Sequence, residues 1–311
     1  MVIFSDEQVK AALGYDKLVK ALEEVFCSNY KMPLRHHHFY ETAEKNENAL
    51  ILMPAWNDEF LGVKQVVVSP LNYQRELPAI HAFYTLMNAS TGEQLAIMNA
   101  AELTSRRTAC TSALAAKYLA PIQAKNLLII GGGKVAKHLI AAHKTVRQYE
   151  KISIWMRNEA KLNQFIKELE FEGHKVEKVT NLEQAVRASD VISCATLSPT
   201  PLFDGNWIKE GTHLDLIGSH KPDTREVDDA AILKSNIYVD SRLGALHETG
   251  ELAIPITNGI FKENDVKADI VELCSAQHPG RANENEITLF KSAGLAIEDL
   301  AAALLVYKSV N

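Results

Sequence analysis

The sequence NLLIIGGGKVA at residues 126–136 places a short apolar run directly before a glycine turn. Such a run is typical of a strand that is buried on both faces of a parallel sheet. The turn and the helical pattern after it match the form G-x-G-x-x-A, in which the first glycine permits the tight turn and the second admits the pyrophosphate. The stretch therefore predicts the start of a Rossmann domain. Its candidate cofactor-binding residues are Gly131, Gly133, Lys134, Val135 and Ala136.

A second strand, KISIWM at 151–156, is followed by Arg157 and Asn158. In enzymes that use NADH, an acidic residue at this position binds the ribose hydroxyls, whereas an arginine suits the 2′-phosphate of NADPH. The sequence therefore favours NADPH, with NADH as the alternative. Arg157 could also be an ordinary solvated surface charge.

Beyond Pro121, short apolar runs alternate with helical patterns. The runs read HKVEKV at 174–179, DVISCAT at 190–196 and THLDLIG at 212–218. This alternation is typical of a doubly wound parallel sheet. We therefore expect the nucleotide-binding domain over residues 121–292, with its strands within about residues 125–285.

Residues 1–120 show a different pattern, in which strand-like runs follow one another without helices between them. These runs lie at 49–56, 61–69, 80–88 and 94–100, separated by short turn-like segments, and a helical pattern follows over 101–120. Consecutive strands of this kind predict an antiparallel meander.

The end of the chain, residues 287–307, reads as a long helix after Ser292. It is too apolar for a free tail, so we expect it to pack back on the first domain. The N-terminal domain would then comprise residues 1–120 and 293–311.

Bulk composition restricts the function. The 311 residues suffice for two domains, and a net charge of −6 argues against nucleic acid as a partner. The apolar runs are too short to cross a bilayer, and the N-terminus lacks the pattern of a signal peptide. The cysteines are scattered, with no C-x-x-C pair, so we expect a cytoplasmic protein with neither disulfides nor a zinc site.

Three basic residues precede the nucleotide-binding stretch: Arg35, Lys64 within the apolar run LGVKQVVVS, and Arg107 within a helix of small and apolar residues. A base in an apolar segment is costly unless it is paired, and an enzyme of small carboxylates needs a cationic clamp. Each base alone could be structural, but together they favour a substrate site.

The run His36-His37-His38 raises the question of a metal site. Adjacent side chains of an extended segment point in opposite directions, so they suit a metal poorly. We expect no metal, and a solvated or substrate-lining loop here.

Longer stretches resemble the ornithine cyclodeaminase/mu-crystallin family. They include ALILMPAW, LGVKQVVV, ELTSRRTACTSALAAKYLA, LLIIGGGKVAKH, ATLSPTPLF, GTHLDLIGSHKPDTREVDD, YVDSRLGALHETGEL and ITLFKSAGLAIEDLAAA. The resemblance implies an α/β protein: a Rossmann domain plus an α+β substrate-binding and dimerisation domain with an antiparallel sheet, commonly forming a homodimer. It implies that Arg35, Lys64 and Arg107 hold the substrate carboxylate. It adds Ala195, Thr196, Leu197, Gly218 and Ser292 as cofactor-binding residues.

The segment Gly218-Ser219-His220-Lys221-Pro222 narrows the expected activity. Cyclodeaminases of the family carry an Asp where this chain has His220. The form GSHKPDTREVDD, with the doubled arginine of ELTSRRTA, is similar to the Δ1-pyrroline-2-carboxylate reductases. The resemblance thus implies reduction of Δ1-pyrroline-2-carboxylate to L-proline with NADPH or NADH, and the six-membered analogue, which gives L-pipecolate, remains open.

Two alternatives remain at this point: an ornithine or lysine cyclodeaminase, and a non-catalytic NADPH-dependent binding protein like mu-crystallin. Lys64 and His220 are the candidate catalytic residues. Lys64 could join the clamp, orient a water or supply the proton. His220 could relay a proton or only line the pocket wall.

Overall fold

The computed structural model describes residues 1–43 and 47–310. The chain divides into two units: unit 1 is Met1–Arg107 with Leu295–Asn311, and unit 2 is Thr108–Gly294. The division falls inside one continuous helix, α3 (Ala100–Leu119), rather than at Pro121 as the sequence suggests. The change of sequence pattern marks the end of this helix, and the helix itself contributes to both units.

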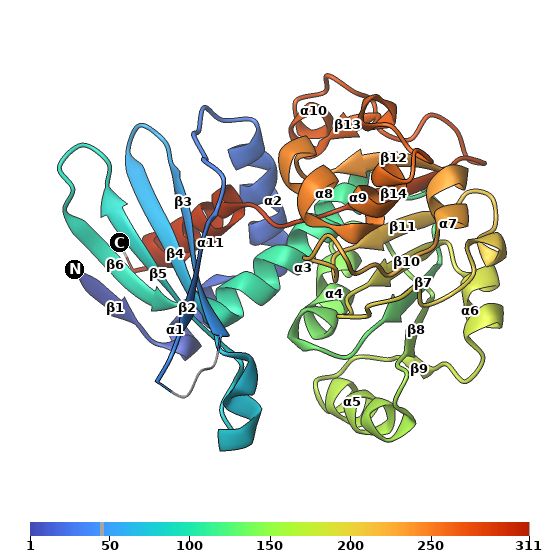
Figure 1. Cartoon of the computed structure of the whole chain (residues 1–311), viewed down its shortest axis with the longest axis horizontal. Coiled ribbons are helices and arrows are strands. Elements are labelled where there is room, and N and C mark those ends of the chain that lie inside the picture. Colours follow the sequence, from blue (N-terminus) through green and yellow to red (C-terminus); the bar gives the residue numbers. More distant parts are fainter. Residues whose placement is uncertain (44–46, 311) are drawn as a thin grey trace. The chain divides into compact units, whose positions relative to one another are not determined.

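Unit 1 contains a six-stranded sheet in the order β1-β6-β5-β4-β3-β2 (Figure 1). The strands are β1 (Val2–Phe4), β2 (His36–Glu41), β3 (Glu47–Trp56), β4 (Phe60–Val68), β5 (Ile80–Asn88) and β6 (Gln94–Asn99). The predicted antiparallel meander, β3 to β6, is confirmed.

Two strands of this sheet were missed. β1 pairs parallel to β6, and β2 pairs antiparallel to β3. The prediction of a loop at His36-His37-His38 is therefore wrong, because these residues form the start of edge strand β2. An edge strand with exposed side chains on both faces lacks the apolar alternation by which strands are recognised.

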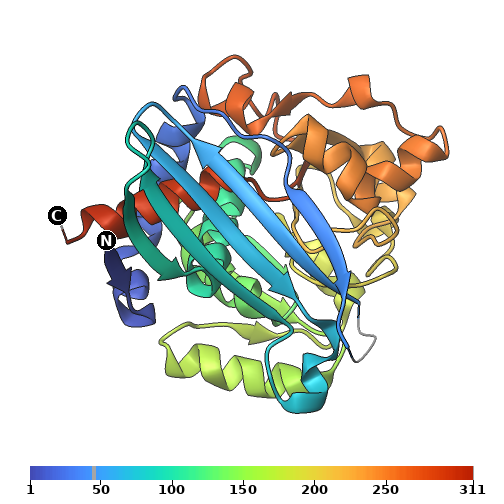
Figure 2. The same ribbon diagram turned by 60° about the vertical axis from the view of Figure 1, so that its left-hand side comes forward.

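Besides the first part of α3, the helices of unit 1 are α1 (Asp6–Ala12), α2 (Tyr15–Phe26) and α11 (Ala296–Lys308). Helix α11 contacts α2 and strands β3 and β4, which agrees with its apolar composition. Figure 2 shows α11 running behind one face of the six strands. A short 3-10 helix, Pro70–Arg75, lies between β4 and β5.

Unit 2 is a doubly wound domain with an eight-stranded, entirely parallel sheet in the order β13-β12-β14-β11-β10-β7-β8-β9. The strands are β7 (Asn126–Ile130), β8 (Lys151–Trp155), β9 (Glu177–Lys178), β10 (Val191–Cys194), β11 (His213–Leu216), β12 (Ser235–Val239), β13 (Ala268–Asp269) and β14 (Ile287–Lys291). The helices are α4 (Lys134–Lys144), α5 (Glu159–Phe171), α6 (Leu182–Ala188), α7 (Asp229–Lys234), α8 (Arg242–Glu248), α9 (Gly250–Thr257) and α10 (Ile270–Cys274).

One strand of unit 2 corrects the sequence analysis. β14 lies beyond residue 285, the expected end of the strands of this domain. It forms the first part of the stretch 287–307 that leads into the last helix, and it pairs with both β11 and β12. Its residues ITLFK are almost all buried, so no alternation of polar and apolar residues marked them as a strand.

The chain order places a topological switch in unit 2 at β7 and β10. From β7 the chain adds β8 and β9 on one side, then crosses to β10 and β11 on the other (Figure 1). In open sheets of this kind, ligands bind outside the carboxyl ends of the strands beside the switch.

Within residues 1–43 and 47–310, no helix combines the length and the apolarity that crossing a membrane requires.

Candidate active site

The turn after β7 requires glycine at its first position. Gly131 has a φ of 132°, and a Cβ there would lie 2.5 Å from the carbonyl oxygen of Ala195. Both the positive φ and the close approach exclude a side chain. Gly131, the first glycine of the predicted motif, thus allows the end of β7 to lie close to the loop that follows β10.

Gly133 differs from Gly131, because it borders open space. It is the N-cap of α4, no side chain caps the helix there, and a Cβ would meet nothing within 4 Å. The N–H groups of the first turn thus have no side-chain cap and the space beside Gly133 is open, which suits a phosphate. Of the following residues, Lys134 is exposed, Val135 is half-buried, and Ala136 is fully buried beneath the helix.

Arg157 and Asn158 follow β8. Arg157 is exposed, and its Nη2 donates to the Ser198 hydroxyl oxygen at 3.1 Å. The Asn158 side chain accepts a hydrogen bond from the backbone N–H of Lys161 at 3.0 Å and so caps α5. Arg157 can therefore reach a ligand at the surface, whereas the oxygen of Asn158 is engaged in the fold.

The remaining predicted residues of unit 2 follow the carboxyl ends of strands. Ala195 and Thr196 are half-buried after β10, Leu197 is exposed, Gly218 is buried after β11, and His220 is exposed two residues later.

Ser292 follows β14 and is buried. Its hydroxyl donates to Asp240 Oδ2 at 3.0 Å, and the same oxygen accepts from the N–H groups of Ala293 and Gly294. Asp240 was not a candidate, although an acid directly after a strand, as in YVD, could have indicated it.

Lys64 and Arg107 come together in unit 1. Lys64 lies on β4, is 2% exposed, and its Nζ is 2.7 Å from Asp299 Oδ2. Arg107 lies on α3, with its Nε 2.9 Å from Asp299 Oδ1 and its Nη1 2.5 Å from Glu298 Oε2. One carboxylate of α11 thus bridges the two predicted cations, and a second holds the arginine.

These ion pairs determine the charge states. Burial lowers the pKa of Arg107, but Asp299 and Glu298 outweigh it and raise that pKa above its usual value, so the guanidinium stays charged. Burial lowers the pKa of Lys64 to about 8, with Arg107 adding to the decrease and Asp299 opposing it. Lys64 is therefore mostly protonated at neutral pH and able to release its proton.

Glu298 and Asp299 were missed. The signal was the pair of acids in AIEDLAAALL, because both are fully buried in an otherwise apolar helix. Buried carboxylates require cations, and the predicted cations Lys64 and Arg107 are those partners.

Arg35 is half-buried and directly precedes β2. The register pairs His36 with Leu52, and Leu52 with Gln65, the neighbour of Lys64. Arg35 thus directly precedes the strand position, His36, that lies two strands from the neighbour of Lys64.

The three histidines of β2 are exposed, and the rings of His36 and His38 make an edge contact with centroids 6.5 Å apart. In the part of the chain that the structure describes, no three His, Cys, Asp or Glu side chains form a group that could hold a metal.

Known proteins resemble this chain over its whole length. The Δ1-pyrroline-2-carboxylate reductase of Colwellia psychrerythraea is 36% identical over 97% of this chain and 97% of its own. The structure of Thermococcus litoralis Δ1-pyrroline-2-carboxylate reductase in complex with NADH and L-proline has a TM-score of 0.92 and 33% identity, and covers 100% of this chain and 97% of that one. An archaeal alanine dehydrogenase dimer with bound NAD has a TM-score of 0.90 and 31% identity, and covers 100% of this chain and 96% of that one.

The sequence model of a family described as "Ornithine cyclodeaminase/mu-crystallin family" matches residues 1–311. The match confirms the resemblance on which the sequence expectations rest, and it includes both units. This chain belongs to the ornithine cyclodeaminase/mu-crystallin family.

Proposed function

We propose that this protein reduces Δ1-pyrroline-2-carboxylate to L-proline with NADPH or NADH. The observation that carries the proposal is the buried pair of Lys64 and Arg107, held by Asp299, in a chain that also has an open dinucleotide turn. The similarity to two Δ1-pyrroline-2-carboxylate reductases, one of them in complex with NADH and L-proline, supports this substrate.

The coenzyme would bind along the carboxyl edge of the unit 2 sheet. Gly133 and the first turn of α4 suit the pyrophosphate, and Arg157 suits a 2′-phosphate. The loops at Ala195–Leu197 and Gly218 would take the nicotinamide half. Ser292 would lie beside them, because its backbone N–H donates to the carbonyl oxygen of Leu216, the last residue of β11. When bound, the coenzyme supplies a hydride to the imine carbon.

The residues of unit 1 would bind and orient the substrate. Arg107 is fixed by two carboxylates, so its guanidinium plane is pre-organised for the substrate carboxylate. Arg35 and Lys64 would complete the clamp, which determines which face of the ring is presented for reduction.

The reaction adds one hydride to carbon and one proton to nitrogen. Lys64 is the proton donor that we favour, because burial brings its pKa to about 8 and Asp299 holds its ammonium group in place. His220 is a second candidate, and its exposed position allows exchange of a proton with water.

The substrate assay is NADPH and NADH oxidation with Δ1-pyrroline-2-carboxylate, Δ1-piperideine-2-carboxylate, and pyruvate with ammonia. The pyruvate arm is included because of the likeness to an alanine dehydrogenase. We expect the highest kcat/KM with a cyclic imine and little ammonia release from ornithine. Ammonia release from ornithine at a rate that matches imine reduction would refute the proposal, and tight NADPH binding without turnover of any substrate would indicate a binding protein.

Coenzyme choice is tested at Arg157. We expect Arg157→Asp to raise the KM for NADPH about 10-fold or more, since a carboxylate repels the 2′-phosphate, and to change the KM for NADH much less. Equal losses with both coenzymes would show that Arg157 does not contact the 2′-phosphate.

We also propose a homodimer formed by the outer face of the unit 1 sheet. Along adjacent strands, Lys64, Tyr84 and Met98 are buried, while the alternate residues Val63, Thr85 and Ile97 are only half-buried. Phe83, which lies on the same face of the sheet as Thr85, is 55% exposed. An apolar sheet face of this kind fits a subunit contact, and the similar alanine dehydrogenase is a dimer.

A further inference from the structure

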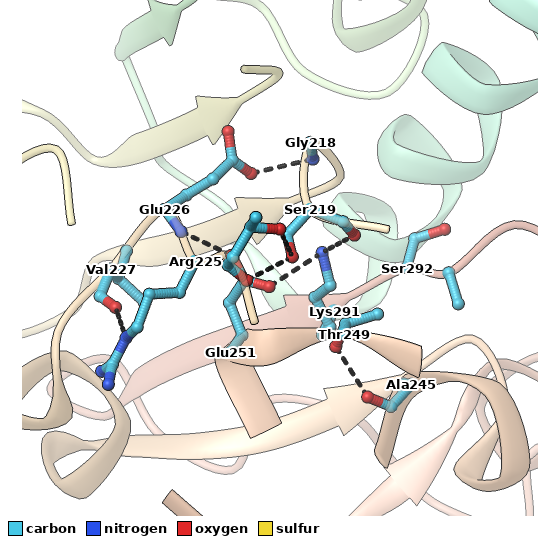
Figure 3. A network of polar contacts seen from close by, with 12 residues as sticks. Gly218, Ser219, Arg225, Glu226, Val227, Ala245, Thr249, Glu251, Lys291 and Ser292 are labelled. Atoms are coloured by element: carbon cyan, nitrogen blue, oxygen red, sulfur yellow. Dashed lines mark hydrogen bonds and ion pairs between the residues drawn. The ribbon is translucent and has the colours of Figure 1, made fainter. Parts of the chain in front are cut away.

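A buried polar network lies at the carboxyl edge of the unit 2 sheet (Figure 3). Three of its charged members, Glu226, Glu251 and Lys291, are each 0% exposed. Glu226 lies between β11 and α7, Glu251 is in the first turn of α9, and Lys291 is the last residue of β14. None of them is a candidate from the sequence.

The carboxylate of Glu226 joins two loops. Its Oε1 accepts from the backbone N–H of Thr196 at 2.7 Å and from the Thr196 hydroxyl at 2.8 Å. Its Oε2 accepts from the backbone N–H of Gly218 at 2.8 Å. Thr196 follows β10 and Gly218 follows β11, so a single side chain connects the ends of two neighbouring strands.

The two loops are also in direct contact. A Cβ on Gly218 would lie 2.0 Å from the carbonyl oxygen of Thr196 and 2.4 Å from Glu226 Oε1. The close approach of Thr196 leaves no room for a side chain at Gly218. The distance between the two loops therefore depends on the hydrogen bonds of Glu226 and on a glycine at position 218.

Glu251 and Lys291 hold this arrangement from the other side. The backbone N–H of Glu226 donates to Glu251 Oε1 at 2.6 Å, and Lys291 Nζ lies 3.3 Å from Glu251 Oε2. Lys291 also donates to the carbonyl oxygen of Ser219 at 3.0 Å. In Figure 3, Lys291 points between Ser219 and Glu251, and so links the loop after β11 to α9.

We propose that Glu226 is a positioning residue for the nicotinamide half of the coenzyme. It sets the separation of the loops that follow β10 and β11, and the Glu251–Lys291 pair holds it in place. Because β7 and β10 form the switch point of the sheet, the loops after β10 and β11 belong to the second nucleotide-binding half. This inference rests on the proposed coenzyme dependence and adds a group that does not itself contact the substrate.

The charge of Glu226 matters to this role. Burial raises its pKa to about 7, Glu251 adds to the rise, and Lys291 and the hydrogen bonds from Thr196 and Gly218 oppose it. The Cys194 thiol on β10 also faces this carboxylate, and burial keeps it neutral by raising its own pKa. A protonated carboxyl would direct an O–H toward one of the N–H donors, so that one loop would lose its hydrogen bond.

The test is Glu226→Gln, which preserves shape but replaces one acceptor oxygen by an amide donor. Binding is measured for NADPH and for 2′-phospho-ADP-ribose, which lacks the nicotinamide, and likewise for NADH and ADP-ribose. We expect the variant to bind the complete coenzyme about 10-fold more weakly, in line with the loss of a charge-assisted hydrogen bond, and the fragment as tightly as the wild type.

Asp190→Asn is the matched control. Asp190 also accepts two backbone N–H groups, those of Lys125 and Asn126 at 2.8 and 2.9 Å, but at the opposite, amino edge of the sheet. The Asp190→Asn variant should have a lower melting temperature, but its affinities for the complete coenzyme and for the fragment should be unchanged. Equal weakening of coenzyme and fragment by Glu226→Gln, or no weakening of either, overturns the proposal.

Wild-type protein provides a second measurement in case Glu226→Gln does not fold. The ratio of coenzyme to fragment affinity should fall as the pH decreases through about 7, and a flat ratio would contradict the proposal. Both readouts are binding measurements, so they remain decisive even if Δ1-pyrroline-2-carboxylate proves not to be the substrate.

Discussion

At the scale of single residues, Lys64 determines how activity should depend on pH. Its pKa is lowered to about 8, so its ammonium is present below that pH and is lost as the pH rises through it. If Lys64 donates the proton, kcat/KM for the imine should fall about 10-fold per pH unit above pH 8. Pre-steady-state and steady-state profiles from pH 6 to 10 measure this.

Lys64→Arg is the control for that pH dependence, because arginine keeps its charge throughout this range. It should lower kcat/KM and remove the decline near pH 8. A wild-type decline that persists unchanged in Lys64→Arg would assign the titration to another group.

The structural role of Arg107, as the cation of Glu298 and Asp299, can be separated from the role in substrate binding that we propose for it. Arg107→Ala leaves the buried carboxylates of Glu298 and Asp299 without one cation, which should destabilise the fold by about 3–5 kcal/mol. The double variant Arg107→Met/Glu298→Gln removes one cation and one anion together. It should recover part of the free energy of unfolding, yet keep a kcat/KM about 100-fold or more below that of the wild type.

Urea denaturation and imine kinetics on the same preparations distinguish the two roles. If turnover returned together with stability in the double variant, Arg107 would serve the fold only, and the substrate clamp would have to lie elsewhere.

At the scale of the elements, Gly131 and Gly133 in the turn between β7 and α4 have different requirements. Gly131 has φ 132° and faces the Ala195 carbonyl, so Gly131→Ala should cost about 2–4 kcal/mol of stability. Gly133 has φ −84° and borders open space. Gly133→Ala should therefore fold within about 1 kcal/mol of the wild type, while its methyl group raises the dissociation constant of the coenzyme about 10-fold.

Thermal unfolding and coenzyme titration of the two alanine variants check this contrast. Tight coenzyme binding by Gly133→Ala would show that the open space beside Gly133 is not where the pyrophosphate binds.

At the scale of the whole molecule, the outer face of the unit 1 sheet predicts the oligomeric state. Val63→Asp places a charge among half-buried apolar side chains and should weaken dimerisation about 100-fold. Leu233→Asp is the control, because Leu233 is 65% exposed on α7 of unit 2. Sedimentation should give a dimer for the wild type and the control, and a monomer for Val63→Asp. A wild-type monomer, or a Val63→Asp dimer of unchanged affinity, would exclude this face.

The sequence by itself determined the features that local patterns express. The sequence predicted the glycine turn after an apolar run and the antiparallel meander in unit 1. It also indicated Lys64 and Arg107 as bases that lie in apolar segments and therefore need partners. Periodicity and turn chemistry depend on residues close together in the chain, so a single sequence contains them completely.

Only the tertiary structure decided which groups meet. Arg107 and Asp299 are separated by 192 positions, and no local pattern pairs them. Strand β14 is buried almost throughout, and edge strand β2 is exposed on both faces, so neither shows the alternation that identifies a strand. The network of Glu226, Glu251 and Lys291 likewise joins three separate elements. Buried charges are stable only with partners, and in this chain the fold brings those partners from distant segments.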